Sequence, residues 1–381
     1  MGIELKTFVL MNKDTEVLEF NYVIEDEIFS YCEEISDFYG KPPHGYRDIE
    51  SWLNGRKSPA NRKFLDCNTE TWHCDKLLAY VCLTHAVSLN DTYWVRSKDE
   101  NIKWENISPY RNRFSDIVSN LAFSVSGDMN TVLEYSTGGV FPKCWRYSDG
   151  DIKLYKGGSS KDSIEPKLEV IASKVYNIIC TEATYYDLGI FIDREISICD
   201  LFTNEQYGIV TLDRLFDRQP KYNELLEFMS NYNCSKSFAE MLIADAITLN
   251  VDRHLGNIAM KVNNDTGEIL SLSQIYDYNR VLLPELTEEI YNNRLRDYID
   301  NAQPRIGLDF FNVARSQLSS YPELLDKVSK VRDEFDCRKY KIKLEDWRLD
   351  AINRIVWGNC ALLLSSCKSI NRFAEISQRL N

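Results

Sequence analysis

The chain has 381 residues, of which 44% are hydrophobic and 27% charged, and its formal net charge is −13. This composition is typical of a globular protein with a large core, and the negative charge argues against direct nucleic-acid binding by this chain. No run of about 18 apolar residues predicts a membrane-spanning helix, and the mixed charges of the first residues argue against a signal peptide, so we expect no membrane insertion.

The first part of the chain, residues 1–125, predicts a helical extension. IEDEIFSYCEEISDFYG, residues 24–40, has apolar residues at helical spacing and ends in Gly. KLLAYVCLTHAVSL, residues 76–89, predicts a second, buried helix, and KPPHGYRD between the two predicts a turn-rich connector.

The pattern changes near residue 130. Residues 131–158, TVLEYSTGGVFPKCWRYSDGDIKLYKGG, predict strands separated by turns. EPKLEVIASKVYNIIC, residues 165–180, predicts a helix with Pro166 in its first turn. YYDLGIFID and EISICDLF predict further strands, so residues 126–221 form a strand-rich small lobe.

From about residue 222 the chain is again helical. Ser237 and Glu240 match a capping box in front of MLIADAIT, residues 241–248. IAMKV, a turn at NNDTGE and ILSLSQIYDY then predict a hairpin, and residues 285–381 predict long helices. The predicted fold class is α+β: a two-lobed, protein-kinase-like fold with a helical N-terminal extension (1–125), a small lobe (126–221) and a helical large lobe (222–381).

Eleven cysteines occur without any CxxC pair, which predicts reduced thiols in a cytoplasm. The candidate metal cluster consists of His73, Cys74, Cys82 and His85. Its spacing matches no zinc pattern, so we interpret these residues as thiols facing helices and as surface histidines.

The segment LNVDRHLGN, residues 249–257, places many polar residues directly after the apolar helix. Phosphoryl transfer from ATP requires a carboxylate that orients the hydroxyl nucleophile, hard oxygen ligands for Mg²⁺ and a fixed cation on the phosphates. Asp252 can orient the acceptor and take its proton, and Asn257 can offer its amide oxygen to the metal. The hairpin would bring Asp277 back to the same place as the main Mg²⁺ ligand.

The cation should be a lysine on a strand, and IKLYK offers Lys153 and Lys156. Side chains alternate along a strand, so Lys156 shares a face with Ile152 and Leu154 and would point into a cleft. We therefore favour Lys156. Glu169 in the following helix is its predicted ion-pair partner, with Glu165 as the alternative.

These residues carry a resemblance to a known family. ADAITLNVDRHLGNIAMKVNNDTGEIL, followed by IYDYN, resembles the catalytic loop of HipA-like serine/threonine kinases and, more distantly, of phosphatidylinositol kinases. KCWRYSDGDIKLYKGG, EPKLEVIAS and CDLFT are similar to the small lobe of that family, and SLNDTYWVRSKDENIKWENI resembles an N-terminal extension of a bacterial HipA-like subgroup. The resemblance covers roughly residues 85–300 and weakens at both ends.

The resemblance implies Asp252 as the catalytic base, Asn257 and Asp277 as Mg²⁺ ligands and Lys156 as the phosphate-binding lysine. It implies ATP and Mg²⁺ as cofactors, a protein substrate carrying Ser or Thr, and a cytoplasmic bacterial protein. It further implies that the chain is the toxin of a toxin–antitoxin pair, whose partner is a small helix-turn-helix antitoxin. One departure is Asn279, where kinases often have Gly; both residues tolerate a left-handed backbone.

The resemblance places the phosphate loop at STGG, which consists of Ser136, Thr137, Gly138 and Gly139. In some HipA-like kinases a serine of this loop is autophosphorylated, and Ser136 or Thr137 could serve here. A plain turn explains the same four residues equally well.

Two rival functions remain open. A lipid or small-molecule kinase shares the DRHxxN pattern, but the acidic stretch PELTEEIYNN, residues 284–293, argues against an anionic lipid. A pseudokinase that acts as a binding module is the second rival, and the filled catalytic positions argue against it.

For His254 we expect a structural role, bonded to the backbone or to Asp277. For Arg253 we expect a contact with an acidic group of the activation segment or with a surface carboxylate.

Overall fold

The computed structural model describes residues 3–25, 29–56, 78, 81, 84–112, 142–148 and 150–379. Contacts divide the chain into two compact units. The first unit comprises Met1–Gly157, Asp200–Asp217 and Met260–Leu270, and the second comprises Gly158–Cys199, Arg218–Ala259 and Ser271–Asn381. The chain thus passes repeatedly between the units, whereas the three consecutive segments expected above stay a prediction.

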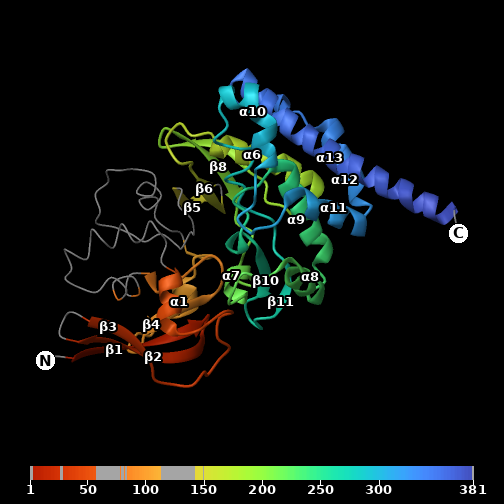
Figure 1. Ribbon diagram of the computed structural model, residues 1–381. Helices are drawn as coiled ribbons and strands as arrows, with labels where there is room; N and C mark the ends of the chain where they lie inside the picture. The colour runs from red at the N-terminus through yellow and green to blue at the C-terminus, as the bar shows by residue number, and fades with distance from the viewer. Residues whose placement is uncertain are drawn as a thin grey trace. The chain divides into compact units, whose positions relative to one another are not determined.

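The first unit begins with a four-stranded antiparallel sheet in the order β3-β2-β1-β4 (Figure 1). Its strands are β1 (Ile3–Asn12), β2 (Thr15–Glu25), β3 (Phe29–Glu34) and β4 (Tyr93–Ser97). Successive side chains of β1 face opposite sides of the sheet, and near the C-terminal end of β1 the side chains on both sides are buried. Phe8 and Leu10 join one apolar cluster with α1 (Ile49–Arg56), while Val9 and Met11 pack with Trp94 and Trp104 in another.

The predicted helix over residues 24–40 is wrong. Residues 29–34 form β3, which pairs with β2 from Phe20↔Glu34 to Glu25↔Phe29. The apolar spacing fits a helix locally, but pairing with β2 satisfies the backbone and overrides that preference. In its described residues, the N-terminal extension is therefore a four-stranded sheet with short helices, not a mainly helical segment. In the second predicted helix, residues 76–89, the described residues Leu78, Val81 and Thr84 are helical and buried, as expected. Residues 85–89 are not helical, because His85 and Ala86 take left-handed conformations with φ of 50° and 51°.

The rest of the first unit contains two predicted hairpins. β5 (Lys143–Ser148) and β6 (Asp151–Lys156) are antiparallel, with Ser148 paired to Asp151 across the turn. β9 (Tyr207–Thr211), β10 (Ala259–Asn263) and β11 (Ile269–Leu272) form a sheet in the order β11-β10-β9. The turn between β10 and β11 closes with Gly267 at φ +64°, a conformation that favours glycine.

The second unit is mainly helical. Its antiparallel pair is β7 (Asp187–Phe191) with β8 (Arg194–Asp200). Its helices are α6 (Glu165–Ile179), α8 (Tyr222–Asn231), α9 (Ser235–Thr248), α10 (Glu288–Asp300), α11 (Phe310–Ser320), α12 (Leu324–Glu334) and α13 (Asp346–Arg379). The second half of α9 is buried on every side because α6, α8, α11 and α13 all contact this helix. It is the central helix of the unit.

The predicted capping box at Ser237 and Glu240 is wrong. α9 starts earlier, at Ser235, so both residues lie inside the helix. Glu240 is buried, where its carboxylate accepts hydrogen bonds from the backbone N–H and hydroxyl of Thr181 and from Lys327. A tertiary contact, and not a helix cap, therefore accounts for a glutamate at position 240. Among the described helices, none has a stretch long and apolar enough to span a membrane.

Candidate active site

The polar segment 249–257 begins where α9 ends. Leu249 caps the helix in the left-handed conformation, with φ 52° and ψ 61°, and its N–H donates to the carbonyl of Asp245. A buried leucine rarely takes this conformation, which costs about 1–2 kcal/mol. The surrounding core holds it there, and the chain reverses direction immediately before the candidate catalytic residues.

Arg253 is the centre of this turn. Its guanidinium forms a bidentate ion pair with Asp245, with Nε–Oδ2 at 2.9 Å and Nη2–Oδ1 at 3.0 Å, and its exposed fraction is 1%. Nη1 also donates to the carbonyl of Asn257 at 2.8 Å and to that of Tyr276 at 3.1 Å. Arg253 thereby joins the end of α9 to the turn and to the residue preceding Asp277. The expected contact with the activation segment or with a surface carboxylate is wrong, because the partner is buried.

Asp245 was missed from the sequence, although a lone Asp within the apolar stretch MLIADAIT could have signalled it. Besides Arg253, its carboxylate accepts from the hydroxyl of Tyr176 and from Asn250 Nδ2. Burial, reinforced by the charge of Asp245, raises the pKa of Tyr176 well above its ordinary value, so this phenol donates as a neutral group. The ring of Tyr176 stacks on Tyr278 at 3.9 Å between centroids.

Asp252 and Asn257 lie together on this turn. Asn257 Nδ2 donates to the backbone carbonyl of Asp252 at 3.2 Å. The amide nitrogen is thus engaged by the backbone, and the amide oxygen is the end that can act as a metal ligand. The Asp252 carboxylate accepts from Arg305 Nη1 at 3.0 Å, and the Arg305 side chain is 67% exposed. Because Arg305 is largely exposed, this ion pair is weak, and the Asp252 side chain itself keeps an exposed fraction of 18%.

Asp277 follows β11 in a loop, at φ +61°. Its N–H donates to the hydroxyl of Tyr186 at 3.2 Å. Both of its neighbours are anchored: the carbonyl of Tyr276 accepts from Arg253, and the N–H of Tyr278 donates to Glu169 Oε1 at 3.0 Å. The loop is therefore tied to the turn that carries Asp252 and Asn257 through Arg253, although the strand itself ends earlier than predicted.

Oxygen ligands from one carboxylate and one amide fit Mg²⁺, which usually retains water and takes further ligands from substrate phosphates. Within the described residues, no group of three or more His, Cys, Asp or Glu side chains is placed to hold a metal. The donor set at Asn257 and Asp277 suits a metal that a nucleotide helps to hold.

Glu169 and Lys156 are both buried, each in its own unit. Glu169, on α6, accepts from Ser197 Oγ at 2.5 Å as well as from Tyr278. Lys156 ends β6 with an exposed fraction of 3%, whereas Lys153 reaches the exposed Asp200 at 3.4 Å. This difference supports the choice of Lys156 over Lys153. The ion pair between Lys156 and Glu169 stays a prediction.

His254 is half-buried and bonds to the backbone, which confirms the structural expectation. Its Nδ1 accepts from the N–H of Gly256 at 3.0 Å, so a proton on the neutral ring resides on Nε2. Burial lowers the pKa of His254; the charge of Asp252 opposes this effect, and the charge of Arg305 adds to it. The predicted phosphate loop at Ser136, Thr137, Gly138 and Gly139 lies outside the described residues.

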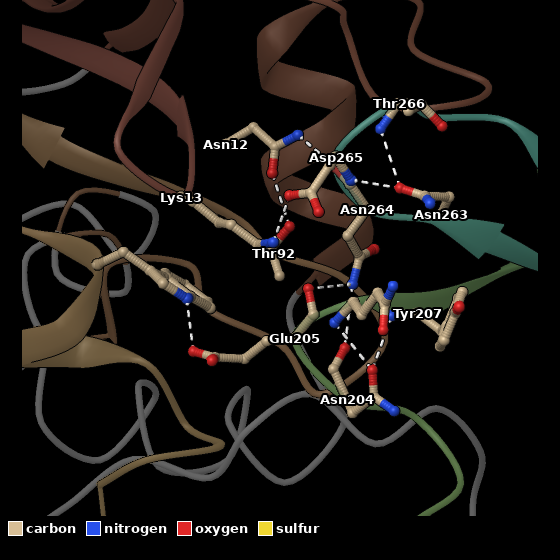
Figure 2. Close-up of polar contacts among 12 residues, drawn as sticks. Asn12, Lys13, Thr92, Asn204, Glu205, Tyr207, Asn263, Asn264, Asp265 and Thr266 are labelled. Carbon is tan, nitrogen blue, oxygen red and sulfur yellow. Dashed lines mark hydrogen bonds and ion pairs between the residues drawn. The ribbon is translucent and has the colours of Figure 1, made fainter.

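A second polar cluster, in the first unit, links the N-terminal sheet to residues 204–207 and to the turn of the β10–β11 hairpin (Figure 2). The backbone carbonyl of Asn264 accepts from Asn12 Nδ2 at 2.9 Å. The side-chain Nδ2 of Asn264 donates to the carbonyls of Asn204 at 3.1 Å and Glu205 at 3.3 Å. The N-terminal sheet therefore braces the hairpin that precedes Asp277.

Glu205 strengthens this brace. Its carboxylate accepts from Trp104 Nε1 and Ser108 Oγ, both at 2.9 Å, and from Arg111 at 2.7–2.8 Å. Burial opposes ionisation, but the hydrogen bonds from Arg111, Ser108 and Trp104 hold the pKa of Glu205 below its ordinary value. Four donor atoms on one carboxylate fix residues 104–111 onto the same segment.

Comparisons with known proteins find similarity to kinases. Residues 170–288, less than half of the chain, match the family model of phosphatidylinositol 3- and 4-kinase, and this span contains Asp252, Asn257 and Asp277. HipA of Shewanella oneidensis MR-1, solved with HipB and operator DNA, is similar over 95% of this chain and 97% of its own, with a TM-score of 0.51 and 13% identity. The proinflammatory kinase CtkA of Helicobacter pylori is similar over 60% of this chain and 95% of its own, with a TM-score of 0.47 and 15% identity. A search of curated proteins gives no match.

These findings define the fold and the class of protein. The chain has a mixed helix and sheet fold of the protein-kinase-like type, as the sequence predicted. The match to a kinase family over the segment that carries the polar turn supports a phosphotransferase. ATP use, commonly with Mg²⁺, is what a kinase domain implies.

Proposed function

We propose that the chain is an ATP- and Mg²⁺-dependent protein serine/threonine kinase of HipA-like type. The observation that carries the proposal is the Arg253 network, which ties the turn bearing Asp252 and Asn257 to the loop bearing Asp277. A phosphotransferase needs these groups held in place before substrate arrives, because preorganisation is the main contribution that the protein makes.

In this proposal Asp252 orients the substrate hydroxyl and accepts its proton. Asn257 and Asp277 would hold Mg²⁺, which supplies positive charge against the phosphates. Lys156 would bind the phosphates and Glu169 would position Lys156, and Ser136, Thr137, Gly138 and Gly139 would form the phosphate loop. The neutral His254 supports the turn through the Gly256 N–H and takes no proton from the substrate.

The test is the intact mass of the chain after incubation with ATP and Mg²⁺, with ADP release measured in parallel. We expect added phosphate and ADP in the wild type and neither in Asp252→Ala. Asp300→Ala serves as a matched control, because Asp300 is an exposed carboxylate whose ion pair, among the described residues, is with exposed Arg296. Equal ADP release from Asp252→Ala and Asp300→Ala would remove Asp252 from the chemistry. A wild type that binds ATP but forms no ADP would favour the pseudokinase.

The family match favours a second candidate, a lipid kinase acting on phosphatidylinositol. The residues after Asp277 oppose it, because α10 begins with Glu288 and Glu289, which repel an anionic membrane surface. Phosphatidylinositol vesicles and a mixture of Ser/Thr peptides, supplied separately with labelled ATP, discriminate the two. We expect label in peptide or in the chain itself; label in lipid alone would select the lipid kinase.

The similarity to HipA, solved with HipB and operator DNA, also supports a role as the cytoplasmic toxin of a toxin–antitoxin pair with a small helix-turn-helix partner. Induced expression in a bacterial host tests this role. We expect growth arrest from the wild type and normal growth with Asp252→Ala. Normal growth with an active wild-type kinase would reject the toxin role and leave the kinase activity standing.

A further inference from the structure

The segment of residues 304–307 is bound through its backbone to the turn that bears the candidate base. The N–H of Arg305 donates to the carbonyl of Val251 at 3.0 Å, and the N–H of Ile306 donates to that of Arg253 at 2.8 Å. Both neighbours of Arg305 are buried, whereas its own side chain is 67% exposed. The fold therefore fixes the backbone at position 305 next to this turn and leaves the side chain at the surface.

Arg305 contacts one charged group in the described part of the chain. Its Nη1 donates to Asp252 Oδ1 at 3.0 Å, and no described residue hydrogen-bonds to Asp252 Oδ2. The candidate base therefore keeps one oxygen for the hydroxyl of the acceptor. The guanidinium keeps most of its N–H groups for a second anion, because it carries five donors and this pair uses one.

The stability of the fold does not account for an arginine at position 305, because an exposed ion pair contributes little to the free energy of unfolding. Arg280 is a useful comparison. Its carbonyl accepts from the N–H of the same Val251 at 3.3 Å, and its partly exposed side chain pairs with Glu285. Of these two arginines next to Val251, Arg305 is the one whose cation meets the candidate base.

The separation between Arg305 and an acceptor hydroxyl follows from this geometry. A hydroxyl bonded to Asp252 Oδ2 would lie about 2.7 Å from that oxygen, so the Arg305 guanidinium would be within about 8 Å of the hydroxyl. Consecutive Cα atoms are about 3.8 Å apart. A side chain within two positions of the acceptor can therefore reach the guanidinium, and more distant positions of an extended peptide lie beyond its reach.

We propose that Arg305 is a specificity-determining residue, which binds one anionic side chain within two positions of the acceptor Ser or Thr. The inference rests on the proposed kinase function. A guanidinium pairs with a carboxylate or a phosphate through two parallel hydrogen bonds, so an acidic residue and a phosphorylated residue both fit. The net charge of this chain is −13, which opposes a polyanionic partner and favours a single anionic group.

Substrate binding would exchange one anionic partner of Arg305 for another. Without substrate the guanidinium contacts Asp252. With an anionic peptide bound it would contact the side chain of the peptide instead. A peptide with a neutral side chain at that position offers no such exchange, so the guanidinium stays on the candidate base. We therefore expect the effect in kcat/KM, which is the quantity that compares competing substrates.

Peptide phosphorylation by the full chain, with ATP and Mg²⁺, tests the proposal. The probes are peptides with one central Ser, in which each position within two residues of it carries Glu, phosphoserine or Gln in turn. We expect the wild type to prefer an anionic peptide over the matching Gln peptide in kcat/KM. The preference should be about tenfold at one or more positions, as a charge-assisted hydrogen bond predicts.

Three variants show whether Arg305 causes this preference. Arg305→Ala should lose it, and Arg305→Lys should retain part of it, because Lys keeps the charge but lacks the planar fork of donors. Arg280→Ala is the matched control and should keep the wild-type preference, because Arg280 pairs with Glu285. The ratio of kcat/KM values within each variant is the measurement, so a uniform change in rate does not affect it.

The outcomes separate this inference from the proposed function. A wild type that forms no ADP would overturn both. An active kinase that labels no peptide, uses the anionic and Gln peptides equally, or keeps its preference in Arg305→Ala would contradict the role of Arg305 alone. A raised KM for ATP in Arg305→Ala with an unchanged peptide ratio would place the guanidinium on the nucleotide and also reject this role. Preference for phosphoserine over Glu would identify a phosphorylated substrate as the source of the anion, and the reverse preference would identify an acidic residue.

Discussion

Arg253 and Asp245 form a bidentate ion pair with both side chains buried, and this pair connects the last turns of α9 to the candidate catalytic turn. Replacing Arg253 by Met leaves Asp245 without its cation in the core. We expect the free energy of unfolding to fall by about 3–5 kcal/mol, measured by urea denaturation. Arg296→Ala is the control, because its pair with Asp300 is exposed and contributes less than about 0.5 kcal/mol. Equal losses in the two variants would contradict the importance of the buried pair.

Asp252 and Arg305 should differ sharply in their effect on activity. In the proposed kinase, Asp252→Asn removes the proton acceptor, so ADP release should fall by about 100- to 10,000-fold. Arg305 is largely exposed and only contacts the carboxylate, so Arg305→Ala should change the rate by less than about tenfold. Steady-state ADP release measures both. A drop for Arg305→Ala as large as that for Asp252→Asn would show that the ion pair itself is needed.

His254 should make the stability of the protein depend on pH. Burial lowers the pKa of His254 in the folded protein below its ordinary value of 6.5. As the pH falls below 6.5 the unfolded chain takes up a proton that the folded chain does not, so the free energy of unfolding decreases.

His254→Asn keeps an acceptor for the Gly256 N–H and removes the titration. The difference in free energy of unfolding between pH 7.5 and pH 5.5 should therefore be smaller in the variant than in the wild type. Urea denaturation at the two pH values measures it. Identical differences in both proteins would show that the pKa of His254 is the same in the folded and the unfolded chain.

Ser237 and Glu240 distinguish a helix cap from a buried network. Glu240→Ala removes the carboxylate that pairs with Lys327 and accepts from the Thr181 N–H, which should cost about 2–4 kcal/mol of the free energy of unfolding. Ser237 lies inside α9 and is exposed, so Ser237→Ala should change it by less than about 0.5 kcal/mol. If the two residues formed a capping box, Ser237→Ala would also clearly lower the free energy of unfolding. Thermal or urea denaturation of both variants distinguishes these outcomes.

The Asn264 side chain should be important for holding residues 204–205 against the β10–β11 turn. Asn264→Ala removes two hydrogen bonds to the carbonyls of Asn204 and Glu205, and we expect a loss of about 1–3 kcal/mol. Its neighbour Asp265 pairs with Lys13 at the surface, so Asp265→Ala should cost less than about 1 kcal/mol. Denaturation of each variant, together with limited proteolysis, measures the two losses of stability. Equal stability of the two variants would mean that the brace does not depend on Asn264.

Local patterns determined several elements correctly. α6 and the β5–β6 and β10–β11 hairpins follow from side-chain periodicity and turn residues close together in the chain. The fold class followed from the order of such elements. The spacing of Asp252, Asn257 and Asp277 also singled out a group that the structure holds together through Arg253, while their catalytic roles stay predictions.

Tertiary structure alone decided the rest. Residues 29–34 are a strand because β2 lies beside them, and helical spacing cannot reveal a partner strand. Arg253 pairs with Asp245 because the left-handed Leu249 ends α9 and the turn after it brings Arg253 back to the helix. A sequence shows which residues carry charge, but burial decides which charges need a partner, and burial depends on contacts between segments far apart in the chain.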